Sequence, residues 1–252
     1  MHAMTTFDRG TQARPAGTNA APLLAADDLL DAGRVLVVAP HPDDEVLGAG
    51  GTIGRLSDAG AEVVVGIITS GAPPLFDESS VSAVRGEAEA AHAHLGVART
   101  VFLGQPAARL DEVPHHRLNR ALADLLREVS PDTLLLPFVG DIHLDHQLTF
   151  LSAMVAARPH GVEFPGRILC YETLSETNWN APLVSPTFVP NVFVDISGQL
   201  ERKLEAMALY ASQQREFPHE RSLATIRALA TLRGSTVHRP AAEAFTLVRQ
   251  VI

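Results

Sequence analysis

The stretch 34–54, RVLVVAPHPDDEVLGAGGTIG, constrains the fold more than any other part of the chain. It begins with an apolar, mostly β-branched run at residues 35–39, and short runs of this kind are typical of strands buried on both faces. Pro40 ends the run, because proline cannot donate to the hydrogen-bond ladder. A small-residue segment with helical spacing follows, and either Asp43 or Asp44 can cap it. The stretch therefore predicts a buried strand that leads through a short polar loop into a helix.

The rest of the chain repeats this alternation of strand and helix. Further strands are expected at 62–69, 100–103, 133–138, 168–173, 192–196 and 245–251. Helices are expected at 45–59, 79–95, 115–129, 145–157, 198–212 and 221–232, with a short one at 22–31. Such alternation implies a mostly parallel sheet with right-handed crossovers and helices on both faces. We therefore predict a single-domain, doubly wound α/β fold with a Rossmann-like N-terminal half, over residues 21–252, after a flexible arm at residues 1–20.

Composition excludes several classes of protein. The net charge of −9 argues against a nucleic-acid binder, which would carry a basic face. No segment approaches the ~18–20 apolar residues of a membrane span, and the first thirty residues lack the apolar core of a signal peptide. The one cysteine, Cys170, lies in an apolar run and is expected to be a buried small hydrophobe rather than a nucleophile. We expect a cytoplasmic protein with no membrane span and no nucleic-acid partner.

Ionisable side chains follow two of the predicted strands. The first strand leads into His41, Asp43 and Asp44, and the fourth leads into a segment, 141–146, with the sequence DIHLDH. The strands of a parallel sheet end at one edge, where ligands bind, so the two clusters can converge if their strands are neighbours. Two histidines and one carboxylate around an open position form the ligand set of a catalytic zinc site, whereas magnesium favours more oxygen ligands. The alternative is that each cluster merely caps a helix.

The other histidines on predicted helices do not share one face with a common partner. His92, His94, His115 and His116 are therefore expected on the solvated surface.

The glycines of the first helix suggest a competing interpretation, a dinucleotide-binding oxidoreductase. Gly48, Gly50 and Gly51 do not have the G-x-G-x-x-G spacing, and no acidic residue ends the second strand to bind a ribose. The glycines more readily explain a close approach of this helix to the sheet. A non-catalytic zinc-binding module is a further alternative.

Several motifs together resemble the LmbE/PIG-L superfamily of zinc-dependent N-deacetylases of amino sugars. The motifs are APHPDDE at 39–45, LGAGGTIGRL at 47–56, HLDH at 143–146 where the family usually has HPDH, Lys203 with YASQ at 210–213, RG at 233–234 and AEAF at 242–245. The resemblance covers residues 34–250. Lys203 and Gln213 are either substrate contacts or structural partners of the second motif.

The resemblance implies an activity: hydrolysis of an N-acyl group, with acetyl expected, from an amino sugar or its conjugate. It implies one Zn²⁺ or another divalent metal per chain, with three ligands. These are His41, Asp44 and His146. Asp43 would be the general base, and His143 would polarise the amide oxygen or protonate the leaving amine. Asp145 would orient His143, or serve as a helix cap. An amidase acting on a non-sugar amide is the alternative, and family members are often homo-oligomers.

The chain departs from the family pattern at positions expected to meet substrate. Val84 stands where an arginine is usual, with Arg85 next to it, and Ala72 stands where an acidic residue is usual. Arg85 can contact sugar hydroxyls or remain a surface charge. Trp179 can stack on a sugar ring or pack under its loop, and His238 is a further candidate for a substrate or subunit contact.

Overall fold

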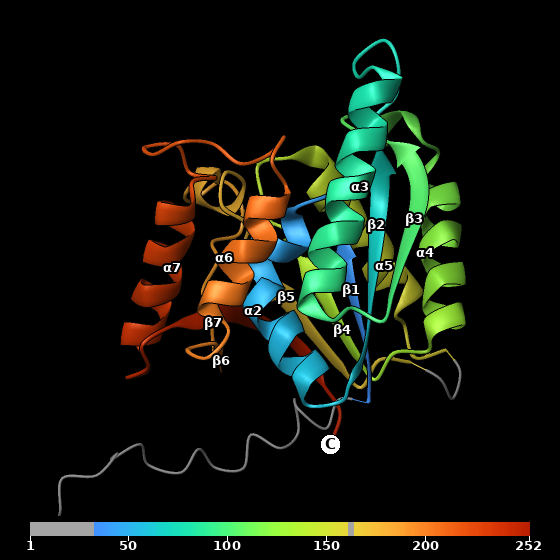
Figure 1. The fold of residues 1–252 in the computed structure, drawn as a ribbon. Helices are drawn as coiled ribbons and strands as arrows, with labels where there is room; N and C mark the ends of the chain where they lie inside the picture. The colour runs from blue at the N-terminus through green and yellow to red at the C-terminus, as the bar shows by residue number, and fades with distance from the viewer. Residues whose placement is uncertain (1–32, 161–163) are drawn as a thin grey trace, which may run out of the picture.

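One seven-stranded sheet runs through the computed structural model, which describes residues 33–160 and 164–252 (Figure 1). Its strands are β1 (Arg34–Ala39), β2 (Glu62–Ser70), β3 (Arg99–Pro106), β4 (Thr133–Pro137), β5 (Arg167–Tyr171), β6 (Val192–Asp195) and β7 (Ala242–Gln250). They lie in the order β3-β2-β1-β4-β5-β7-β6. Neighbours from β3 to β5 are parallel, and β7 is antiparallel to β5 and β6. The predicted mostly parallel, doubly wound sheet is confirmed.

Helices cover both faces of the sheet (Figure 1). They are α2 (Asp44–Asp58), α3 (Glu78–Leu95), α4 (His115–Val129), α5 (Leu144–Ala156), α6 (Leu200–Leu209) and α7 (Leu223–Ser235), with 3-10 turns η1 (Leu110–Glu112) and η2 (Thr177–Trp179). Side chains of a strand alternate between faces. Thus Val35 and Val37 pack with α2, α3, α6 and α7, while Leu36 and Val38 pack with α4 and α5. Burial on both faces explains the continuous apolar run of β1.

Glycines allow α2 to lie against its neighbours. A Cβ atom added to Gly48 would lie 2.2 Å from Cδ2 of Tyr171, and one added to Gly51 would lie 2.8 Å from Ile196. The expected role of the glycines, close packing of the helix, is confirmed. Tyr171 is also fixed from its other end, because its hydroxyl donates to the carbonyl of Val38 at 2.8 Å.

A buried ion pair holds α2 to the last strand. The ammonium of Lys203 lies 2.6 Å from Oε1 of Glu243 and donates to the carbonyl of Leu47 at 2.8 Å. The Glu243 carboxylate also accepts from the backbone amides of Gly51 and Thr52, at 2.9 and 2.7 Å. Lys203 is therefore a structural residue, and its partner is the helix after the first motif rather than the second motif.

Element boundaries differ from the predicted ones by a few residues. Strand β3 is longer than predicted and contains an irregularity opposite 67–69. Helix α6 ends at Leu209, before the YASQ segment. Cys170 is buried, as expected. No helix within 33–160 and 164–252 is long and apolar enough to cross a membrane. The predicted arm at 1–20 and helix at 22–31 lie outside the described residues.

Candidate metal centre and active-site cleft

The two polar clusters meet because their strands are neighbours. Strand β1 pairs with β2 on one side and β4 on the other, so the strand order reverses direction next to β1. In open α/β sheets, ligands bind beyond the carboxyl ends of the strands at such a point. The backbone amide and the hydroxyl of Thr69, near the end of β2, both donate to the carbonyl of Pro40 and fix the first loop.

His41, Asp44 and His146 converge on one point. Each offers one ligand atom, and these atoms all lie within 4.8 Å of one another. Oδ2 of Asp44 is 3.4 Å from Nδ1 of His41 and 3.2 Å from Nε2 of His146. Nε2 of His146 is fully buried and makes no hydrogen bond to any residue that the structure describes. A buried imidazole nitrogen that faces a carboxylate and lacks a hydrogen bond fits a cation at this position.

Two further carboxylates hold the imidazole rings from behind. Nδ1–H of His146 donates to Oδ2 of Asp141 at 2.8 Å, and Nε2–H of His41 donates to Oδ2 of Asp145 at 3.0 Å. Each histidine thus directs its other nitrogen toward Asp44. Histidines that bind metals almost always donate their second N–H in this way. The donor set and its supports therefore suit zinc or a similar transition metal.

The charges in this cluster depend on one another. Burial would raise the pKa of Asp44, but His146 and His41 hold it well below its usual value. Burial would lower the pKa of His41, but hydrogen bonds to Asp145 and Asp44 raise it to about 9. Burial opposes the charge of His146 too, yet Asp44 and Asp141 raise its pKa well above the ordinary value. Because imidazole binds metals in its neutral form, a metal must displace these protons.

The side chain of Asp43 faces the cleft and does not cap helix α2. This residue precedes α2 with a positive φ of 113° and makes no side-chain cap. Its amide N–H donates to Oε2 of Glu45 at 3.3 Å, and its Oδ2 accepts from Nη1 of Arg221 at 3.0 Å. Burial raises the pKa of Asp43 to about 8, against the opposing charge of Arg221. Such a carboxyl group, strongly perturbed at the edge of a cleft, is a candidate acid or base.

Sequence reasoning missed Arg221, which it placed only at the start of a helix. Besides Asp43, the guanidinium reaches Oγ of Ser175 at 3.0 Å and Oε1 of Glu176 at 3.7 Å. Burial raises the pKa of Glu176 to about 7. These contacts join segments distant in the chain, and Asp43 and Arg221 are 178 residues apart. No local pattern signals such a pairing.

His143 and Asp145 interact differently from the expectation. The backbone amide of Asp145 donates to Nδ1 of His143 at 3.1 Å, so His143 is itself the cap of α5. The Asp145 carboxylate instead accepts from His41 and from the amides of Ala108 and Leu110, at 2.7 and 3.1 Å. Burial and the nearby His41 lower the pKa of His143. A neutral His143 whose Nδ1 accepts must carry its proton on Nε2.

The prediction for His92 is wrong. This histidine is buried, since it shares the inner face of α3 with Ala88 and Leu95. Its Nε2–H donates to Oε1 of Glu45 at 3.0 Å, and its Nδ1 lies 2.7 Å from the hydroxyl of Thr100. His92 therefore holds the carboxylate of Glu45, which in turn accepts a hydrogen bond from the amide of Asp43. The prediction for the other three is confirmed: His94, His115 and His116 are exposed, and His94 lies beside Glu205.

A cleft of about 840 Å³ opens over these groups. Its polar end is lined by His41, Asp43, His143, Glu176 and Arg221, and Arg85 lines it farther out. Trp179 and His238 do not line this cleft. The indole of Trp179 is 61% exposed and donates to Glu220 at 2.6 Å, and His238 lies in the turn between α7 and β7.

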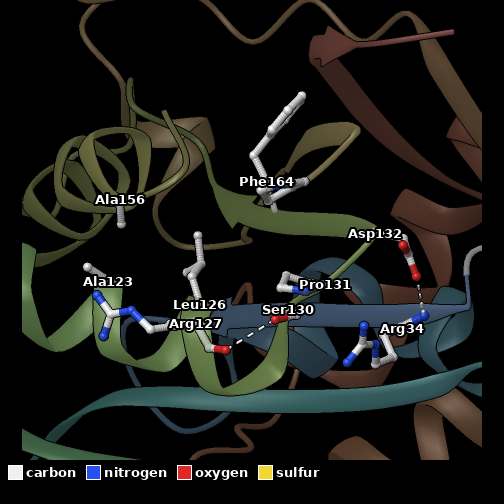
Figure 2. Close-up of a pocket in the computed structure, with 10 residues that line it drawn as sticks. Arg34, Ala123, Leu126, Arg127, Ser130, Pro131, Asp132, Ala156 and Phe164 are labelled. Atoms are coloured by element: carbon white, nitrogen blue, oxygen red, sulfur yellow. Dashed lines mark hydrogen bonds between the residues drawn. The ribbon is translucent and has the colours of Figure 1, made fainter. Parts of the chain in front are cut away.

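A second cavity, of about 340 Å³, lies at the opposite edge of the sheet, where β1 and β4 begin (Figure 2). The carboxylate of Asp132 accepts there from the amide of Arg34 at 2.9 Å. The hydroxyl of Ser130 donates to the carbonyl of Arg127 at 3.1 Å. Both groups of potential metal ligands found within the described residues include His41 and belong to the larger cleft. The larger cleft is therefore the candidate active site.

Comparisons with known proteins agree with this assignment. The PIG-L family model, described as GlcNAc-PI de-N-acetylase, matches residues 36–157. The chain is 30% identical to diacetylchitobiose deacetylase of Thermococcus kodakarensis, over 75% of this chain and 72% of that protein. It is 29% identical to 2'-N-acetylparomamine deacetylase of Streptomyces fradiae, over 72% and 74%. The solved structure of N,N'-diacetylchitobiose deacetylase from Pyrococcus horikoshii matches with a TM-score of 0.72 and 27% identity, over 88% of this chain and 86% of that one.

Proposed function

This chain belongs to the PIG-L family of deacetylases, and we propose that it is a zinc-dependent hydrolase that removes an N-acetyl group from an amino sugar or an amino-sugar conjugate. The observation that carries the proposal is the arrangement of His41, Asp44 and His146 at the end of an open cleft, beside the Asp43 carboxylate, which is not one of these three ligands. The relatives named above are a diacetylchitobiose deacetylase and a 2'-N-acetylparomamine deacetylase, which supports an acetylated amino sugar as the substrate class.

The metal would be held by His41, Asp44 and His146, with Asp145 and Asp141 orienting the two imidazoles. A zinc ion at this site supplies Lewis acidity, which polarises an amide carbonyl and acidifies water. Asp145 is thus a positioning residue for His41. Through its bonds to Ala108 and Leu110 it also fixes the segment between β3 and α4 against the site.

Asp43 is the proposed general base. Its carboxylate projects into the cleft and is not part of the converging ligand set. The Arg221 guanidinium favours the charged form of this carboxylate, and a bound cation would favour it further. Asp43 can therefore accept a proton from the attacking water and pass it toward the nitrogen of the leaving amine.

His143 is proposed to donate a hydrogen bond from Nε2. Because the amide of Asp145 occupies Nδ1, the donor of the neutral ring is fixed. The ring of His143 lies 4.6 Å from that of His41, centroid to centroid, and both line the cleft. From there His143 can donate a hydrogen bond to the developing oxyanion, while Asp43 carries the proton to the leaving amine.

The test is a screen of acetylated amino sugars and their glycosides for released acetate, with bound zinc measured in parallel. We expect about one bound zinc ion per chain and release of acetate from at least one of the sugars. Asp43→Asn should retain zinc and lose turnover by roughly 10²–10⁴-fold. Equal rates for the variant and the natural chain would remove Asp43 as the base. Acetate released only from non-sugar amides would indicate an amidase, and zinc without any hydrolysis would indicate a binding module.

A further inference from the structure

The outer part of the cleft is apolar, in contrast to its catalytic end. We call Ala72, Phe76, Val81, Val84 and Phe102 the apolar wall, since all five line the cleft. Phe76 is 40% exposed, and Val81, Val84 and Phe102 are partly exposed. Contiguous apolar side chains left open beside a catalytic site indicate that something apolar binds there.

The apolar wall lies beyond the catalytic end along the edge of the sheet. The catalytic loop leaves β1, whereas Phe76 and Val81 pack over Gly71, just past the end of β2, and Phe102 belongs to β3. Adjacent strands are about 4.8 Å apart, so Phe102 lies roughly 10 Å from β1 across the sheet. An acetyl group at the metal ligands is too short to reach the wall. The wall therefore meets another part of the substrate.

Two charged groups near the wall, Arg85 and Asp77, already have partners. The guanidinium of Arg85 lies 4.3 Å above the ring of Phe102 and donates to Glu89 at 3.3 Å. Ser80 bonds through its amide and its hydroxyl to Asp77, at 2.8 Å each. The wall itself therefore offers apolar surface, and the stacked Arg85 extends the flat face of Phe102, while the exposed Glu78 lines the same cleft.

We propose that the apolar wall binds an apolar aglycone, an aryl or alkyl group attached to the amino sugar whose acetyl group is removed. The inference rests on the proposed function and names its substrate class. The amide lies at the metal ligands, the sugar spans the end of β2, and the aglycone covers Phe76 and Phe102. The wall is continuous with the catalytic end within one cleft, which allows one molecule to reach both.

The experiment compares kcat/KM for acetate release by the zinc-loaded chain from the methyl and phenyl glycosides of N-acetylglucosamine. We expect the phenyl glycoside to be favoured by about tenfold or more. Phe76→Ser and, independently, Val84→Ser should reduce this ratio severalfold, mainly through a lower kcat/KM for the phenyl glycoside. Leu75→Ser is the matched control, because Leu75 is 58% exposed on the same loop but does not line the cleft. It should leave the ratio unchanged.

A second arm keeps the methyl glycoside and lengthens the acyl group from acetyl to hexanoyl. A preference for hexanoyl without one for phenyl would assign the wall to the acyl chain and overturn the inference. Equal kcat/KM for the methyl and phenyl glycosides would overturn it while leaving the proposed function intact. If Phe76→Ser changed the mass of the protein assembly in solution but not the phenyl-to-methyl ratio of kcat/KM, the wall would be an interface with a second copy of the chain, and the inference would be overturned. If no glycoside releases acetate, the proposed function itself fails.

Discussion

Replacing Lys203 with methionine should destabilise the protein strongly, because the buried Glu243 would lose its counter-ion. The two side chains are 4% and 3% exposed and lie 2.6 Å apart. Breaking a buried ion pair by removing one partner costs about 3–5 kcal/mol. The Glu243 carboxylate keeps three hydrogen bonds, from the amides of Gly51 and Thr52 and from the Thr52 hydroxyl. We therefore expect the lower end of that range, about 3 kcal/mol.

Thermal and urea unfolding measure this effect. For a chain of this length, 1 kcal/mol corresponds to roughly 2–4 °C in Tm, so Lys203→Met should lower Tm by about 6–12 °C. The matched control is Arg227→Met, which removes the partner of Glu201 in an ion pair whose side chains are 47% and 68% exposed. Exposed pairs contribute less than about 1 kcal/mol, so the control should lose at most about 4 °C.

A double variant separates the loss of the pair from the burial of an unpaired charge. Lys203→Met combined with Glu243→Gln leaves a neutral amide, whose oxygen can still accept from the backbone of α2. It should be more stable than Lys203→Met alone. If the double variant were no more stable, or if Lys203→Met and Arg227→Met lowered Tm equally, the reasoning from burial would be refuted.

Three further predictions concern the site and its helix. Asp141→Asn should weaken zinc binding about 10–100-fold by removing the acceptor behind His146; chelator competition measures it, and unchanged affinity would contradict it. Gly48→Ala should cost about 1–3 kcal/mol in urea unfolding, because its Cβ would overlap the ring of Tyr171. Gly86→Ala on α3 should instead stabilise by roughly 0.5–1 kcal/mol, because no atom of the described residues lies within 4 Å of the added Cβ. The folded state raises the pKa of Asp43 from 3.8 to about 8, so the metal-free fold binds this proton more tightly than the unfolded chain and should lose stability as pH rises from 4 to 8. Asp43→Asn should flatten that dependence in urea titrations with chelator, and an identical slope in both proteins would refute the assignment.

Local patterns predicted most of the fold and the convergence of the two clusters. The β1 run is continuously apolar because both of its faces are buried, and the proline and carboxylates after it mark the end of the strand. Once β1 and β4 are neighbours, His41 and His146 come together without further information. The role of the glycines in α2 was also predictable. Their spacing does not match a nucleotide-binding loop, which left close packing of the helix as the explanation.

Contacts between distant segments were not predictable from local patterns. Arg221 reaches Asp43 from a loop whose position depends on the packing of α6 and α7. His92 was expected on the surface because the spacing of the helical histidines gave them no common partner, yet its face of α3 packs toward the sheet and Glu45. The carboxylate of Asp145 could have turned to either of two histidines, and the amides of Ala108 and Leu110 place it beside His41.

The position of β7 has a consequence for synthesis of the chain. This strand lies between β5 and β6, so the edge of β5 stays open until residues 242–250 have left the ribosome. An open strand edge can pair with other chains, which makes the nascent protein prone to aggregate until β7 has been synthesised. Strand β7 also carries Glu243, whose carboxylate binds the amide of Gly51 in α2 from 192 positions farther along the chain. Helix α2 therefore lacks this contact until β7 has been synthesised.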